Sequence, residues 1–271
     1  MDVGLLTDIL TRLILGLGVG FAIGMTGIGS GVIAMPYLLY GVGLSPVSAV
    51  GTGLLYSTLT KVYGTYVHFR LRTIRKRTAF YIILGGAPAA FVASRVVLYL
   101  AGIYGSGLDY VLKIVISFVM LGTWGLMFAG FLKNRKTSSE SYYAPPKRFP
   151  ARRKIYGITA GLGLGVLAGS TSIGGGVLII PILAAIFRLS PNNTVGTSVF
   201  IGVIISAVSS FVYFLGGNIN LLVAMTLFIG SIPGIYLGSR TAVRLPHRVL
   251  SAILFVVVTA SVIAMFAGLR R

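Results

Sequence analysis

Long apolar stretches, separated by short polar or glycine-rich connections, make up most of the chain. Each half divides into four of them, at 9–43, 46–69, 78–101 and 109–132 and then at 155–188, 191–215, 219–244 and 247–269. Stretches of this length can cross a bilayer core of about 30 Å as helices. The pattern therefore predicts an all-α polytopic membrane protein.

The first stretch of each half is too long for one simple span. As a single helix, residues 9–43 would run about 52 Å. Glycine clusters fall in the middle of both stretches, at 27–31 and 174–176, and a proline follows each cluster. We expect each half to have a Gly-broken or re-entrant first segment plus three transmembrane helices. Such backbone is tolerated at membrane depth where protein or a water-filled cavity covers it.

The two halves are homologous repeats with a constant spacing. The segment Gly29–Pro36 returns as Gly174–Pro181, an offset of 145 residues (181 minus 36). At the same offset, Ser45-Pro46 returns as Ser190-Pro191. A serine followed by a proline is typical of a helix start, so we predict that the second helix of each half begins there.

Equivalent connections carry opposite charge. The connection after the second stretch has five Lys or Arg between 70 and 77 in the first half, and its counterpart at 216–220 is uncharged. The next connection reverses this, since 101–109 has no Lys or Arg and 240–248 has three arginines. Under the positive-inside rule, the reversal favours inverted repeats. A parallel repeat of eight full spans is the alternative, and it places the two C-terminal arginines on the basic side.

Composition agrees with a multi-pass protein of the cell membrane. The mean hydropathy is +0.95 and the net charge is +19, with the basic residues mostly in connections. We therefore expect membrane lipids as partners and no nucleic acid. The chain divides into repeat 1 (1–132), a basic linker that we expect to be cytoplasmic (133–154) and repeat 2 (155–271). Whether the protein forms a homodimer is left open.

The repeated glycine clusters are the candidate substrate site. Glycine lets backbone amides approach a ligand closely, and helix N-termini attract anions. Nearby hydroxyls can donate to ligand oxygens, and an ammonium inside an apolar stretch can attract an anion. The candidate residues are Gly29, Ser30, Gly31, Thr52, Lys61, Ser172, Gly174, Gly175, Gly176, Thr197 and Ser198. In each case a structural role is the alternative: close helix packing, a bond to the helix's own carbonyls, or extension of the lysine to the membrane surface.

The distribution of acidic residues narrows the function classes. Asp2, Asp8, Asp109 and Glu140 are the only acids, and none lies centrally in an apolar stretch. A carboxylate that binds a proton or sodium within the membrane is thus missing, and an acid-lined cation pathway is unsupported. The chain also lacks the residue sets for general acid–base catalysis or metal binding, so we expect no enzyme activity and no cofactor. The interior favours an anion or a neutral solute.

The paired motifs resemble the TauE/SafE family of sulfite-exporter-type permeases. The resemblance rests on Gly-Ile-Gly-Ser-Gly-Val with Pro36, on Ser45-Pro-Val-Ser-Ala-Val-Gly-Thr52, and on their second copies ending at Pro181 and Thr197. It implies a prokaryotic-type plasma-membrane permease for small anions, often sulfur-containing ones such as sulfite, sulfonates or sulfoacetate. The copies differ, because Ser30 matches Gly175 in the second copy, so the two half-sites are chemically unequal.

These observations predict a permease that carries a small anionic substrate by alternating access around a midplane site between the repeats. An anion channel with the same lining residues is the alternative, and a non-transporting scaffold is a third interpretation. A dry, well-packed repeat interface would favour the scaffold.

Overall fold

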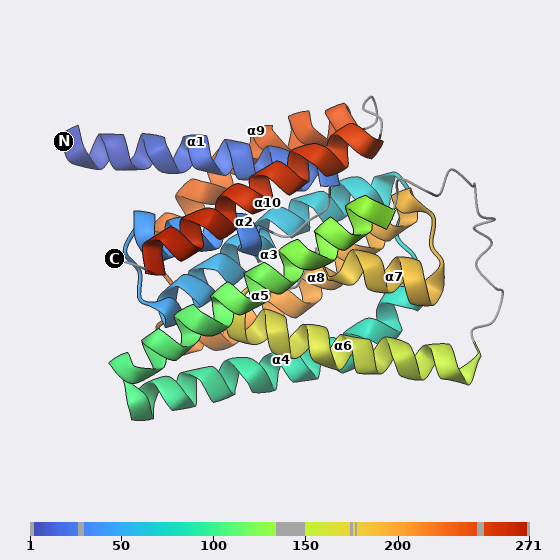
Figure 1. The fold of residues 1–271 in the computed structure, drawn as a ribbon, viewed down its shortest axis with the longest axis horizontal. Coiled ribbons are helices and arrows are strands. Elements are labelled where there is room, and N and C mark those ends of the chain that lie inside the picture. Colours follow the sequence, from blue (N-terminus) through green and yellow to red (C-terminus); the bar gives the residue numbers. More distant parts are fainter. Residues whose placement is uncertain are drawn as a thin grey trace.

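The computed structural model of the protein describes residues 3–26, 30–133, 150–173, 176, 178–242 and 247–269, and these form helices and short connections without a strand (Figure 1). The elements are α1 (Val3–Thr26), α2 (Gly31–Pro36), the π-helical turn η1 (Tyr37–Gly41), α3 (Pro46–Arg70), α4 (Lys76–Tyr104), α5 (Ser106–Lys133), α6 (Ala151–Thr171), α7 (Ile179–Phe187), α8 (Pro191–Leu215), α9 (Leu221–Ala242) and α10 (His247–Leu269). Within the described residues, five helices are long and apolar enough to cross a bilayer. The protein is a multi-pass membrane protein.

The predicted interruption of the first stretch is present in both halves. Helix α1 ends at Thr26 and α2 begins at Gly31, while α6 ends at Thr171 and α7 begins at Ile179. At the second break, Ser172 adopts the left-handed conformation with φ +60°. Each first stretch therefore consists of a long helix and a shorter one, as the glycine clusters indicated.

In repeat 1, the two pieces of the first stretch start and finish at the same end of the bundle. Helix α1 runs parallel to α9, with Gly16 against Leu227 and Gly24 against Ile235, so α1 begins near the start of α9. The connection after η1 returns to that end, where Leu44 and the first residue of α9 line one hollow. In Figure 1, α1 begins and α10 ends at this end.

Repeat 2 repeats this path at the other end of the bundle. Gly157, near the start of α6, lies against Tyr81, near the start of α4, and against Phe187, the last residue of α7. Helices α6 and α7 thus enter and return at the end where α4 begins. Of the predicted linker, residues 134–149 lie outside the described part, and residues 151–154 form the first turn of α6.

The Ser-Pro pairs begin the second helices, as predicted. Proline occupies the first turn of both α3 and α8. The Ser45 hydroxyl accepts a hydrogen bond from the Ser48 amide at 3.3 Å, which satisfies one free donor at the start of α3. Ser190 takes the same extended backbone conformation, and its hydroxyl instead bonds with the side-chain amide of Asn193, 2.8 Å away.

Helices α3 and α8 pack against each other in antiparallel directions at the centre of the molecule. A Cβ on Gly51, near the start of α3, would lie 2.9 Å from Tyr213 Cβ, near the end of α8. A Cβ on Gly196, near the start of α8, would lie 3.2 Å from His68 Nδ1, near the end of α3. Each pair is the other shifted by the repeat offset, so the two equivalent helices meet in a symmetric contact.

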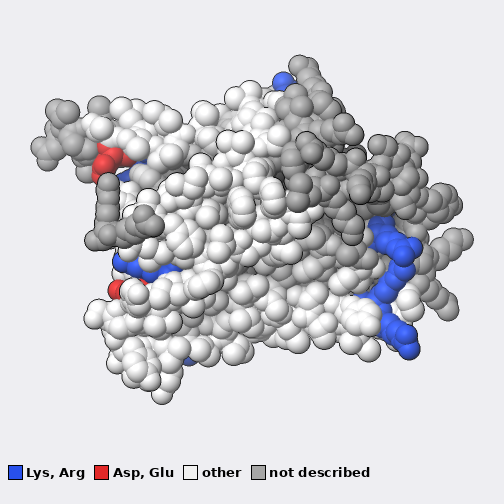
Figure 2. All heavy atoms as spheres, viewed as in Figure 1, with Lys and Arg blue, Asp and Glu red and all other residues white. Residues whose placement is uncertain are grey.

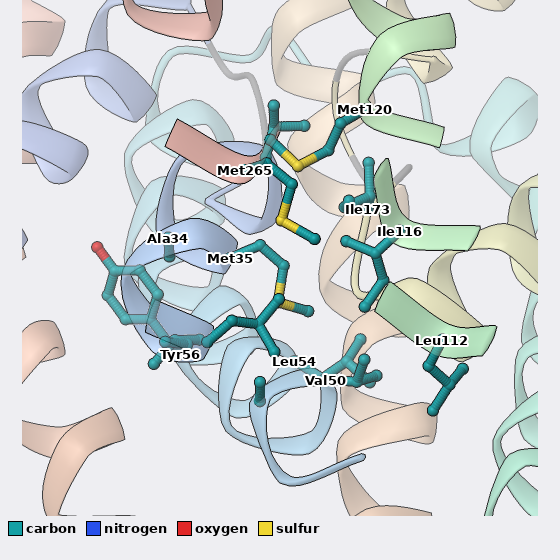
Figure 3. Packing of buried hydrophobic residues seen from close by; sticks show 14 of the residues in the cluster. Ala34, Met35, Val50, Leu54, Tyr56, Leu112, Ile116, Met120, Ile173 and Met265 are labelled. Atoms are coloured by element: carbon teal, nitrogen blue, oxygen red, sulfur yellow. The ribbon is translucent and has the colours of Figure 1, made fainter. Parts of the chain in front are cut away.

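A cluster of large apolar side chains lies between α2, α3, α5 and α10 (Figure 3). Met35, Met120 and Met265 come from three of these helices and are fully buried together. Ile173, from the break in the second repeat, also belongs to this cluster. The break of repeat 2 is therefore anchored in the core that repeat 1 largely builds, and burial of these side chains holds it there.

Charged side chains gather near the two ends of the bundle. Figure 2 shows a concentration of basic side chains at the end where α6 begins, and acidic side chains with a few basic ones beside them near the opposite end. The basic end contains the α3–α4 connection and the first turn of α6, with Arg70, Arg72, Arg75, Lys76, Arg77, Arg152, Arg153 and Lys154. Such a distribution is typical of a protein oriented by the positive-inside rule.

Candidate functional site

The two helix breaks lie against each other inside the protein. A Cβ on Gly31, at the start of α2, would collide with the carbonyl oxygen of Ser172 and lie 3.4 Å from its Oγ. A Cβ on Gly53 of α3 would lie 2.9 Å from the same Oγ. Glycine is needed at position 31, where the Ser172 carbonyl occupies the space of a side chain, and a side chain at position 53 would displace the Ser172 hydroxyl. The structure therefore brings Gly31 and Ser172 together.

Two hydroxyls at this contact have no hydrogen-bond partner among the described residues. Ser30 is fully buried and Ser172 is 6 % exposed, and neither Oγ atom makes a bond there. A buried hydroxyl left without a partner typically costs about 1–3 kcal/mol. Both groups are therefore available to a polar ligand, and they come from equivalent breaks of the two repeats.

The remaining glycine candidates are only partly described. Gly176 is buried in the turn that precedes α7, and its carbonyl accepts a hydrogen bond from the Ile180 amide at 3.3 Å. Gly29, Gly174 and Gly175 lie outside the described residues. Their part in a site stays a prediction.

Lys61 lies at the middle of α3 and is enclosed by protein. Its exposed fraction is 2 %. Its neighbour Thr60 lies about halfway along α3 between Gly51 and His68. These two residues make the symmetric contacts with α8. Lys61 therefore sits close to the point about which the repeats are related. Its repeat equivalent is Ser206, whose hydroxyl donates to the Gly202 carbonyl at 2.6 Å.

Thr52 and Thr197 form another symmetric pair, but not at the breaks. Thr52 Oγ1 accepts a hydrogen bond from the Asn220 amide at 2.9 Å, and Thr197 Oγ1 accepts one from the Arg75 amide at 3.0 Å. Each hydroxyl therefore ties its own helix to the connection after α8 or α3 of the other repeat. The two threonines lie at opposite ends of the α3–α8 pair, so the structure does not bring them together.

Ser198, the last of the candidates, bonds within its own helix. Its hydroxyl donates to the Val195 carbonyl at 2.8 Å. This is the local bonding that serine often makes in helices. Ser30, Gly31, Ser172 and Lys61 are thus buried inside the described structure, with Ser172 against Gly53 near the start of α3 and Lys61 eight residues further along that helix.

Two hollows accompany the central helices. One, of about 370 Å³, opens at the end where α9 begins and is lined by Leu44, Ser48, Gly217, Ile219, Asn220 and Leu221. The other, of about 20 Å³, lies deeper and is lined by Ile23, Gly24, Gly64, Val67, His68, Val199, Ile235 and Ser239. A space of 20 Å³ is large enough for a water molecule.

His68 lines the smaller hollow, and the equivalent residue of repeat 2 is a tyrosine, Tyr213. Tyr213 is fully buried and donates to the Gly169 carbonyl at 3.0 Å. The equivalent of Gly169 in repeat 1 is Gly24, which lines the hollow. Sequence analysis did not single out this difference, although it is visible when the repeats are aligned at their offset.

Within the part of the chain that the structure describes, no group of three or more His, Cys, Asp or Glu residues is close enough to hold a metal ion.

Comparisons with known proteins agree over nearly the whole chain. A family model described as "Sulfite exporter TauE/SafE" matches residues 12–265. The chain is 26 % identical over 249 residues to "Probable membrane transporter protein YjnA" of Bacillus subtilis (strain 168), which covers 92 % of this chain and 96 % of that protein.

Two further relatives have similar names. "Probable membrane transporter protein YunE" of Bacillus subtilis (strain 168) is 23 % identical over 248 residues, covering 87 % of each chain. "Probable membrane transporter protein" of Xylella fastidiosa (strain Temecula1 / ATCC 700964) is 27 % identical over 229 residues, covering 84 % of this chain and 82 % of that protein. No solved structure matches the chain with significant similarity.

Proposed function

Because the chain belongs to the sulfite exporter TauE/SafE family, we propose that this membrane transporter is a secondary permease for a small sulfur-containing anion such as sulfite or a sulfonate. The observation that carries the proposal is the contact between the two breaks, with the unpartnered hydroxyls of Ser30 and Ser172 and with Lys61 near the centre of the same bundle. Hydroxyl donors and an ammonium are the groups that bind the oxygens of such an anion.

The substrate site is proposed between the repeats. Gly31 supports this placement, since the lack of a side chain lets the break of repeat 1 approach Ser172 of repeat 2. Gly29, Gly174, Gly175 and Gly176 would complete the walls with backbone amides. We expect the site to bind anions because no carboxylate is present in α2, α3, α7, α8 or α9.

Alternating access is proposed for the mechanism, with residues 1–132 and 155–271 as inverted repeats. The antiparallel contact of the equivalent helices α3 and α8 supports inversion, as does the entry and return of the two first stretches at opposite ends. In a protein built this way, one repeat rocks against the other around a fixed midplane site. The basic end would face the cytoplasm of the cell membrane.

Binding and transport measurements on two hydroxyl variants test the site. In a thermal-shift screen of the purified protein, we expect sulfite or a sulfonate such as sulfoacetate to raise the melting temperature, because a bound ligand stabilises by mass action. Ser30→Ala and Ser172→Gly should weaken that shift and slow counterflow of the same anion in proteoliposomes. Glycine is chosen at Ser172 because it tolerates the positive φ.

Ser117→Ala is the matched control. It removes a buried hydroxyl that bonds only to its own helix, at the Lys113 carbonyl, and it should leave both measurements unchanged. Wild-type binding and counterflow in both site variants would defeat the site assignment.

A channel with the same lining is distinguished by electrical recording. The closed contact of Gly31 with Ser172 supports a carrier, since an open pore would need a gap there. Single-channel currents in a planar bilayer would contradict the carrier, whereas saturable counterflow without currents agrees with it.

A further inference from the structure

The central lysine has no acidic partner in the described structure. An ion pair of the described residues lies instead on α1, where Arg12 Nη2 and Asp8 Oδ2 are 3.1 Å apart. Lys61 forms neither an ion pair nor any described hydrogen bond, although it is 2 % exposed. An ammonium held away from water without a counter-charge is costly, and the cost falls when an anion binds beside it.

The charged and titratable groups on α3 and on the elements packed against it are tyrosines, one histidine, basic residues and one acid. Helix α8 contributes Tyr213, whose hydroxyl bonds to Gly169, and α9 contributes Tyr236 with Arg240 stacked on its ring at 4.3 Å. Helix α2 contributes none. The remaining groups of α3 itself and of η1, α4 and α5 are tyrosines, His68, basic residues and the acid Asp109, at the start of α5. None of the packed elements brings a carboxylate to the middle of α3.

A water-sized space lies about one turn along α3 from Lys61, toward the basic end of that helix. Lys61 and His68 are seven residues apart, which places them on the same face of α3 and about 10 Å apart along its axis. Gly64, one turn from Lys61, and His68 both line the 20 Å³ hollow. The equivalent space in repeat 2 is filled by Tyr213.

We propose that Lys61 carries the coupling ion of the transport cycle, a proton, which moves in the same direction as the anion. The amine takes up one proton when the anion binds and releases it when the anion leaves. The empty carrier then returns with a neutral amine. Each cycle moves one proton with each anion, so transport of a monovalent anion is electroneutral. This inference rests on the proposed function.

The coupling follows from reciprocity. If a bound anion favours the protonated amine, then protonation must favour the bound anion by the same factor. A carrier whose empty form is neutral and whose loaded form pairs an ammonium with an anion never exposes an unpaired central charge to the membrane. A permanently charged group at position 61 would keep the anion site and hinder the return of the empty carrier.

Reconstituted full-length protein and radiolabelled methanesulfonate test the proposal. Methanesulfonate is a suitable probe because its charge does not change over the working pH range, so any proton movement belongs to the protein. We expect the wild type to exchange the probe between equal concentrations on both sides. We also expect an acidic outside to drive its accumulation, with one proton consumed from the medium for each anion.

Two lysine-to-arginine variants separate the role of Lys61 from a general effect of charge. Lys61→Arg should retain exchange and lose accumulation driven by the pH gradient. Lys113→Arg is the matched control, since this lysine lies on α5 with its Nζ 6.0 Å from the Tyr40 ring, and it should retain both activities.

The outcomes distinguish this inference from the proposed function. A wild type that does not exchange methanesulfonate overturns both. A wild type that exchanges it, but neither accumulates it under a pH gradient nor consumes protons, overturns the proton coupling alone. Accumulation by Lys61→Arg, or loss of its exchange activity, overturns the assignment to Lys61.

Discussion

Buried polar side chains in this protein divide into those with a partner and those without. Tyr56 and Ser231 bond to each other at 2.7 Å between α3 and α9, and Ser231 also donates to the Leu227 carbonyl at 2.6 Å. A hydroxyl has one proton, so the Tyr56 hydroxyl must be the donor to Ser231. Such pairs hold helices together, while Ser30 and Ser172 remain free for a ligand.

Removal of the Tyr56 hydroxyl tests the structural role of these partnered side chains. Tyr56→Phe should lower the free energy of unfolding by about 1 kcal/mol, because one buried interhelical hydrogen bond is lost. The melting temperature in detergent is the measurement. Tyr110→Phe removes a hydroxyl from a side chain that is 67 % exposed and should cause no shift. Equal melting temperatures for both variants would contradict the assigned role of Tyr56.

Helix pairs from different repeats pack through glycines spaced four residues apart. Gly16, Gly20 and Gly24 of α1 lie against α9, and their equivalents Gly161, Gly165 and Gly169 of α6 lie against α4. In each case a Cβ would strike backbone atoms of the neighbouring helix. Small residues at this spacing let membrane helices approach closely. The first helix of each repeat therefore packs closely against the third helix of the other repeat.

Two glycines of α6 provide a direct comparison. Gly165→Val should destabilise the protein by about 1–3 kcal/mol or more, because the new side chain meets the Gly86 carbonyl and the Ala89 side chain. Gly163→Val adds the same atoms to the same helix two residues away, where nothing lies within 4 Å. Detergent-solubilised yield and melting temperature measure both. Similar losses in the two variants would refute close packing of α6 on α4.

The proposed inversion of the repeats concerns the whole assembly, because under it connections that match in sequence lie on opposite sides of the membrane. Such an arrangement would account for one connection being basic and its counterpart uncharged. The exchanged hydrogen bonds of Thr52 and Thr197 fit the same arrangement, since each joins one repeat to a connection of the other.

Cysteine labelling in intact cells tests the inverted arrangement. The chain contains no cysteine, so single cysteines can be placed without background. Arg70 and Leu215 are equivalent, exposed residues at the last positions of α3 and α8. We expect a membrane-impermeant maleimide to label Leu215→Cys from outside and Arg70→Cys only after the membrane is opened. Labelling of both from one side would favour the parallel repeat.

Much of the helical framework could be predicted because its signals are local or repeated. The apolar lengths indicated the spans, the glycine clusters indicated both breaks, and Ser45-Pro46 marked the start of α3. The site was harder to predict. The repeat suggested that Thr52 and Thr197 would join the glycines, but helices equivalent in sequence are antiparallel in space, which carries these two residues to opposite ends.

The linear pattern was sufficient for what depends on contact with lipid or on the chain's own backbone: apolar spans, helix starts, interruptions and the asymmetry of charge. Packing between distant segments added the rest. It joined α1 to α9 and α6 to α4, enclosed Lys61 without an acidic partner, and left a hollow at His68 where Tyr213 fills the equivalent place. These features depend on which surfaces meet after folding, and local preferences carry no information about that choice.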